Sequence, residues 1–144
     1  VTSQSLKSLF ECLNDEGVNV AGTILKPNMV TSGSMAESQA SIQEVAEMTV
    51  KCLNENVPSD LPGVTFLSGG QSDVNATAHL DAMNKIGSFP WKLSFSYGRA
   101  LQQPSLKAWL GKEENVSQAQ EALSHRALMN KLAANGAWNL GLEN

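Results

Sequence analysis

The sequence has little cysteine, few aromatic residues and no basic run. Its two cysteines, Cys12 and Cys52, are too few for a disulfide scaffold or a metal site, and they favour a reducing compartment. No apolar run approaches the roughly 20 residues that span a bilayer. The net charge is −4, whereas nucleic-acid binding needs clustered lysine and arginine. We therefore expect neither a membrane-spanning protein nor a nucleic-acid-binding one.

The composition that is present is typical of one globular domain. Hydrophobic residues make up 42% of the 144 residues and charged residues 17%, which are ordinary globular values. Apolar side chains three and four residues apart predict amphipathic helices, and short apolar runs predict strands. Helices are expected over 5–14, 42–53, from the Ser72 cap to the break at Gly87, and over 104–132 with an interruption near Gly111; strands are expected over 18–25, 63–67 and 91–95.

The alternation of these elements predicts the fold class. Helices that alternate with strands indicate a parallel sheet with right-handed crossovers, and strands that are apolar throughout indicate that both faces are covered. An eightfold barrel needs about 250 residues, so three strands alone cannot close one. The fold is therefore expected to be either a small open α/β layer or part of a larger barrel.

Lysine follows the first expected strand. In parallel α/β folds, ligands bind at the carboxyl ends of the strands, which is where Lys26 stands. Burial at that point favours the neutral amine, and a neutral amine can attack a carbonyl to form a Schiff base. The alternative is a lysine that reaches solvent or pairs with an acid.

The loops after the other two strands carry groups suited to phosphate. Ser68 offers a hydroxyl, and Gly69–Gly70 brings backbone N–H groups close to a helix N-terminus. Gly98 permits close approach of the backbone, and Arg99 supplies a guanidinium fork. Alone, these loops are as consistent with a tight turn and a surface ion pair. Together with Lys26 they predict a site for a phosphorylated carbonyl compound.

The remaining candidates are expected to be structural. His79 and His125 lie on predicted helices, away from the strand ends, and are expected to pack or to face solvent. Both cysteines are expected to pack between helices. Packing anchors are expected at Trp91, Trp109 and Trp138.

Four stretches carry a family resemblance. Residues 22–31, GTILKPNMVT, resemble the Schiff-base lysine segment of the class I fructose-1,6-bisphosphate aldolases. Residues 64–72, VTFLSGGQS, and 94–101, SFSYGRAL, are similar to the two phosphate-loop segments of that family. The following helix of the family is similar to residues 106–109 with 111–115. The resemblance extends over residues 1 to about 135, in the same order and with nearly the same spacing.

The resemblance implies a fold, an activity and a set of site residues. The fold is a (β/α)8 TIM barrel, of which residues 1–135 form the C-terminal part with strands six to eight, followed by an irregular tail, residues 136–144, that is shorter than in the family. The implied enzyme is a glycolytic and gluconeogenic lyase that cleaves fructose 1,6-bisphosphate into dihydroxyacetone phosphate and glyceraldehyde 3-phosphate. It uses no metal or other cofactor, because the protonated iminium is the electron sink. The implied Schiff-base residue is Lys26, and the implied phosphate cradle is Ser68, Gly69, Ser96, Gly98 and Arg99.

The resemblance also implies partners for this chain. The acid–base residues and the second phosphate site of the family lie on strands one to five, outside this sequence. We therefore expect the 144 residues to be inactive without an N-terminal barrel half, on the same or on a separate chain. A homotetramer is implied, in the cytoplasm or, as an alternative, in a plastid. The alternative functions are a catalytically incomplete half-barrel that serves as a structural subunit, and a module that binds phosphate without chemistry.

Overall fold

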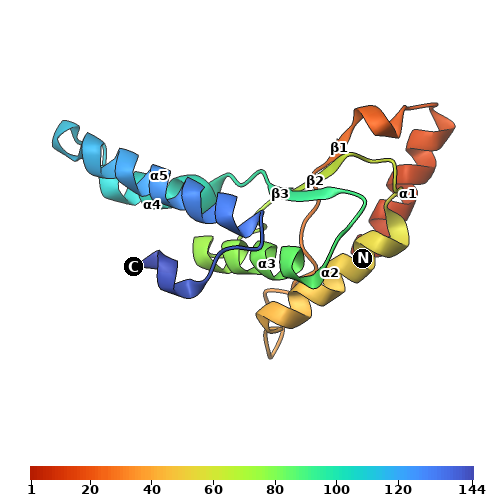
Figure 1. The fold of residues 1–144 in the computed structure, drawn as a ribbon, viewed down its shortest axis with the longest axis horizontal. Helices are drawn as coiled ribbons and strands as arrows, with labels where there is room; N and C mark the ends of the chain where they lie inside the picture. The colour runs from red at the N-terminus through yellow and green to blue at the C-terminus, as the bar shows by residue number, and fades with distance from the viewer.

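Three parallel strands lie at the centre of the fold (Figure 1). The strand β1 (Ile24–Leu25) pairs with β2 (Gly63–Phe66), which in turn pairs with β3 (Lys92–Phe95). Leu25 lies beside Val64 in this register. The carboxyl ends of the strands therefore meet at the same edge of the sheet, as the sequence predicts.

Helices connect the strands and extend beyond them. The computed structural model describes all of residues 1–144. In Figure 1, α2 and α3 lie below the strands, and α4 and α5 run side by side away from the sheet. None of the helices has both the length and the apolar content needed to cross a membrane. The α-helices are α1 (Thr2–Asp15), α2 (Ile42–Asn56), α3 (Asp73–Ile86), α4 (Arg99–Trp109) and α5 (Val116–Ala133), and the 3-10 helices are η1 (Val20–Gly22), η2 (Glu113–Asn115) and η3 (Leu140–Glu143).

Two helices begin where their capping residues predict. Ser41 Oγ accepts a hydrogen bond from Glu44 N, and the Glu44 carboxylate accepts one of 2.8 Å from Ser41 N. This reciprocal capping box satisfies donors that the first turn of α2 leaves free. Ser72 Oγ likewise accepts from Asn75 N at the start of α3, and Gly87 ends that helix.

The core lies between the sheet and the two helices below it. Val64 and Phe66 of β2 are fully buried. The residues expected on the apolar stripe of α3, Ala76, Leu80 and Met83, are fully buried as well, and all five belong to one hydrophobic cluster. The predicted α/β alternation and this stripe are confirmed.

The first strand is shorter than the sequence predicts. The apolar run 18–25 forms a strand only at Ile24–Leu25, because Val20–Gly22 forms η1 and Thr23 Oγ1 donates back to Val20 O. The strand β1 has a neighbour on one side only, and Ile24 is 64% exposed. The expectation that both faces of every strand are covered is therefore wrong for β1.

The last helical region starts earlier than expected. The expected start was Pro104, but α4 begins at Arg99 and carries Pro104 inside it. Gly98 O accepts from Leu101 N and Gln102 N, and these bonds form the first turn. The expected interruption near Gly111 is confirmed, because α4 ends at Trp109.

Two of the expected packing residues face solvent. Trp109 is 43% exposed, since it lies at the end of α4 that points away from the sheet (Figure 1). Cys12 is also exposed, so the packing expectation is wrong for both. Trp91 and Trp138 are buried, as predicted.

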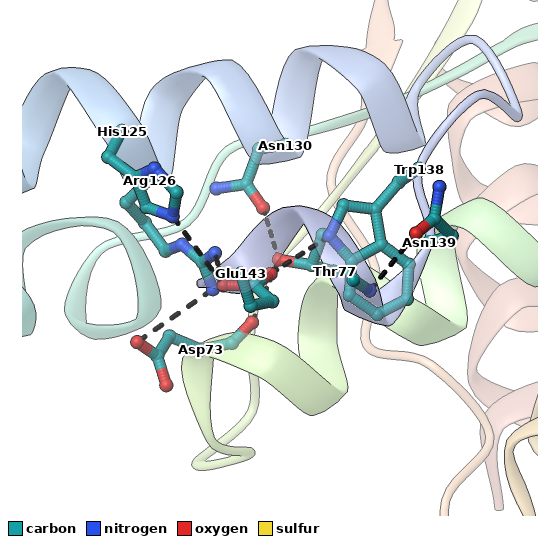
Figure 2. Close-up of polar contacts among 9 residues, drawn as sticks. Asp73, Thr77, His125, Arg126, Asn130, Trp138, Asn139 and Glu143 are labelled. Atoms are coloured by element: carbon teal, nitrogen blue, oxygen red, sulfur yellow. Dashed lines mark hydrogen bonds and ion pairs between the residues drawn. The ribbon is translucent and has the colours of Figure 1, made fainter.

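The C-terminal segment turns back along α3 and α5 (Figure 2). Trp138 donates its backbone N–H to Asp81 Oδ1 of α3 over 2.9 Å, and its indole N–H to Glu143 over 2.9 Å. Glu143 also pairs with the guanidinium of Arg126, which belongs to α5 and is 2% exposed. Residues 136–144 therefore include an ordered segment, η3, held by buried polar groups.

Candidate functional site

Backbone hydrogen bonds continue past the strand ends and join the three predicted site segments. Leu67 N, just after β2, donates to Pro27 O over 3.0 Å. Ser96 N, just after β3, donates to Phe66 O over 2.9 Å. The loops that follow the three strands are therefore aligned as neighbours, in the order of the strands. The predicted grouping of these loops at one edge of the sheet is present in the fold.

A tight turn leads from β2 into α3. Gly69 and Gly70 have φ angles of +59° and +84°, a left-handed conformation that glycine adopts without steric cost. Gln71 N donates to Ser68 O over 3.0 Å and closes the turn. Ser68 itself is buried. The turn leads directly into the N-terminus of α3, a kind of position that suits an anion.

The side chain of Arg99 lies against this turn. A Cβ atom built on Gly70 would lie 3.9 Å from Arg99 Nη2. Arg99 is the first residue of α4, and no side chain caps that helix. The first backbone N–H groups of a helix have no partner within it, so the start of α4 carries a partial positive charge in addition to the guanidinium charge of its first residue. Ser96 and Gly98, which precede Arg99, are exposed.

A cavity of about 460 Å³ lies between the turn and α4. Its wall includes Gly70 and Gln71 from the turn, and its charged residues are Arg99, Lys107 and Asp73. The cavity therefore has two positive groups and one negative group, which favours an anionic ligand. Lys107 was not predicted as a site residue, although its spacing of eight from Arg99 places both on one face of a helix.

The surroundings of Lys26 differ from the prediction. Lys26 directly follows β1, as expected, but its side chain is exposed. The reason is that β1 is an edge strand with no neighbour on its outer side. Within these 144 residues, the exposed side chain agrees with the alternative of a lysine that reaches solvent and not with a buried, desolvated one, because no strand pairs with that edge.

Two positioning residues escaped the sequence analysis. The Tyr97 hydroxyl donates to Ala76 O of α3 over 2.8 Å, and Gln71 Nε2 donates to Ser68 O over 2.9 Å. Burial raises the pKa of the Tyr97 phenol. Tyr97 therefore ties the loop after β3 to α3, and Gln71 supports the turn after β2. Their place inside the loop motifs was the only sequence signal, since the partners of Tyr97 and Gln71 depend on the packing of α3.

No three His, Cys, Asp or Glu side chains gather closely enough to hold a metal ion. The cavity beside Arg99 is lined by the turn after β2, the start of α3 and by α4, and no residue of the Lys26 segment lines it.

Comparisons with known proteins agree with one another. The family model described as "Fructose-bisphosphate aldolase class-I" matches residues 1–144. The probable fructose-bisphosphate aldolase class 1 of Xanthomonas axonopodis pv. citri (strain 306) is 53% identical over 139 residues, which are 96% of this chain and 42% of that protein. Fructose-bisphosphate aldolase 2 of Caenorhabditis elegans is 50% identical over 142 residues, 98% of this chain and 37% of that protein.

A solved structure is similar in fold as well as in sequence. It is a ternary co-crystal structure of the Plasmodium falciparum aldolase in complex with TRAP and a small-molecule inhibitor. The TM-score is 0.94 at 46% identity, over 96% of this chain and 40% of that chain. The chain thus spans about two fifths of the length of the curated relatives and the solved structure that it matches.

Proposed function

Because this chain belongs to the class I fructose-bisphosphate aldolase family, we propose that it is the C-terminal part of a Schiff-base lyase barrel, with strands six to eight. The lyase cleaves fructose 1,6-bisphosphate to dihydroxyacetone phosphate and glyceraldehyde 3-phosphate. The observation that carries this proposal is the ladder of hydrogen bonds beyond the strand ends. Through it, the loops with Lys26, Ser68 and Arg99 become neighbours.

Lys26 is the proposed nucleophile. Its amine attacks the ketone carbon of the substrate, and loss of water leaves an iminium linked to Nζ. The positively charged iminium nitrogen then accepts the electron pair of the C3–C4 bond as that bond breaks. Proton transfers in these steps are assigned to groups of the other barrel half, where the family resemblance puts the acid–base residues.

The two loops beyond β2 and β3 are the proposed cradle for one substrate phosphate. The turn at Ser68 and Gly69 offers a hydroxyl and backbone N–H groups, and Gly98 lets the backbone approach the anion. Arg99 supplies two parallel N–H donors to the phosphate oxygens. Ser96, which is exposed, adds a second hydroxyl. The net positive lining of the adjoining cavity supports this assignment.

We further propose that an N-terminal barrel half completes the enzyme. The outer edge of β1 presents unpaired backbone groups, and natural sheets cover such edges. The half that covers it belongs to the same or to a separate polypeptide, and the assembled enzyme is a homotetramer. Its place is in glycolysis, in the cytoplasm, with a plastid location as the alternative.

Borohydride trapping tests the role of Lys26. The complete enzyme is incubated with dihydroxyacetone phosphate and reduced, and the peptide that carries the adduct is identified by mass spectrometry. We expect the adduct on Lys26 and its loss in Lys26→Met. Lys51→Met is the matched control, because Lys51 is an exposed lysine on α2. An adduct at another lysine, or turnover by Lys26→Met, would contradict the proposal.

The mass of the intact polypeptide tests the completion of the barrel. One polypeptide that contains Lys26 together with about 250 barrel residues is expected if both halves are on one chain. A native polypeptide of 15.4 kDa that stays active only with a second, co-purifying chain would place the other half on that partner. Full activity of the 15.4 kDa chain alone would overturn the proposal.

A further inference from the structure

The amide of Gln71 lies where two of the site segments meet. Its Nε2 donates to Ser68 O over 2.9 Å and reaches Met29 Sδ at 3.5 Å. Met29 is buried and follows Lys26 closely in the chain. One side-chain amide therefore links the phosphate-type turn after β2 to the segment that carries the proposed nucleophile.

These contacts fix which way the amide points. Since Nε2 is used by Ser68 and Met29, Oε1 faces the other side, where His79 Nδ1 lies 2.5 Å away. An amide oxygen only accepts hydrogen bonds, so Nδ1 of His79 must carry the proton and donate it. His79 belongs to α3 and is 5% exposed.

The other ring nitrogen of His79 keeps the imidazole in this form. His79 Nε2 is buried and has no hydrogen-bond partner. A second proton there would place an N–H group where nothing accepts it, and burial lowers the pKa of the imidazole. His79 is therefore a neutral donor with a single tautomer, directed at Gln71.

We propose that His79 is a positioning residue for the aldolase reaction, which it serves by holding the Gln71 amide between the Lys26 segment and the Ser68 turn. The inference rests on the proposed function. A substrate whose phosphate lies in the turn presents its ketone carbon to Lys26 at a distance set by the offset between these two segments. Errors in such alignment slow the reaction of bound substrate more than they weaken its binding.

The test compares His79→Leu with His79→Asn in the complete enzyme. Leucine has no hydrogen-bond donor and fills a volume similar to that of histidine. Asparagine keeps a donor, because its Nδ2 can donate from about the position of His79 Nδ1. The rate of adduct formation on Lys26 is measured at saturating dihydroxyacetone phosphate, alongside inhibition by inorganic phosphate and thermal unfolding. Phosphate reports on the cradle alone, and adduct formation reports on alignment.

We expect His79→Leu to lower the rate of adduct formation by roughly five- to tenfold, the equivalent of one lost hydrogen bond. Phosphate inhibition is expected to change by less than about twofold, because the backbone bond from Gln71 N to Ser68 O still closes the turn when His79 is replaced. His79→Asn is expected to restore most of the rate. A wild-type rate in His79→Leu overturns the proposal, and so does equal impairment of both variants, which would mark a packing effect.

A second variant keeps the test decisive if His79→Leu fails to fold. Gln71→Leu removes the other partner at a half-buried position and must lower the rate of adduct formation by roughly five- to tenfold. Where His79→Leu does fold, the combined variant should show little further loss. Normal adduct formation by Gln71→Leu overturns the inference. The wild-type measurement tests the proposed function separately from the variants. If the wild-type enzyme forms no adduct on Lys26, the proposed function fails, and the role of His79 fails with it.

Discussion

The hydroxyl of Tyr97 lies 2.8 Å from the backbone carbonyl of Ala76 and donates a hydrogen bond to it. This bond ties the loop after β3 to α3, the helix that begins at the turn after β2. Tyr97 stands between Ser96 and Gly98, two of the proposed phosphate contacts. Burial raises the pKa of the phenol, so the hydroxyl keeps its proton in the physiological range and remains a donor.

Removal of this hydroxyl tests its contribution. Tyr97→Phe is expected to lower the free energy of unfolding by about 1 kcal/mol, the net value of a typical buried hydrogen bond. It should also raise the KM for phosphorylated substrate, because the loop loses its support from α3. Urea unfolding and steady-state kinetics measure the two effects. Ser117→Ala, which removes an exposed hydroxyl, serves as the control and should change neither quantity.

The left-handed turn predicts the effect of a methyl group. Gly69→Ala places a side chain at a φ of +59°, which costs about 1 to 2 kcal/mol. The strained turn should also bind inorganic phosphate more weakly. The matched control is Gly33→Ala, since nothing lies within 4 Å of a Cβ at Gly33 and its φ is not left-handed. If the two variants bind inorganic phosphate with equal affinity, Gly69 does not contribute to the proposed phosphate cradle.

The buried guanidinium predicts a large loss of stability. Arg126→Met removes the buried guanidinium that pairs with Glu143 and Asp73, and breaking a buried ion pair costs about 3 kcal/mol. Lys51→Met breaks the exposed pair with Glu55 and should cost less than about 1 kcal/mol. Chemical denaturation of both variants measures the difference. Similar losses for the two would mean that the contacts of Arg126 in Figure 2 add little to stability.

The capping box of α2 predicts a dependence on acid. The pKa of Glu44 is lowered from 4.5, first by the hydrogen bond from the Ser41 backbone and then by that from its hydroxyl. A carboxylate whose pKa is lower in the folded state adds stability above its unfolded pKa and loses it as the pH falls through the folded pKa. Wild type should therefore be more stable than Glu44→Gln at pH 7. This difference in stability should disappear as the pH falls below 4.5. Urea unfolding, followed by helix content at each pH, measures it.

Local signals predicted most of the fold. The Ser41–Glu44 pair and Ser72 mark helix starts because their partners lie within one turn of the chain. The grouping of three loops at one edge followed from the parallel alternation of elements. The environment of Lys26 depends on what pairs with the outer edge of β1, which the sequence of this segment does not show. The strand itself was predicted too long, because Val20–Gly22 forms η1 and Thr23 bonds back to it.

The sequence did not predict the contacts between segments that are far apart along the chain. The bond from Trp138 to Asp81 joins positions that are 57 residues apart, and no periodicity marks the segment that makes it. Trp109 and Trp138 are the same residue type, but one lies at an open helix end and the other beneath the returning chain. Composition does not distinguish these environments, since they depend on how the helices pack.

The helix α3 is held from several sides at once. Tyr97 bonds to it from the loop after β3, Asn130 from α5 and Trp138 from the C-terminal segment. Regions fastened in this way open only when the whole molecule unfolds, whereas an edge strand opens by small local fluctuations. In native-state hydrogen exchange, the amides of α3 should therefore be the slowest, and those around β1 among the fastest. The proposed phosphate turn is thus attached to the most persistent part of the chain, and the lysine segment to one of the most labile.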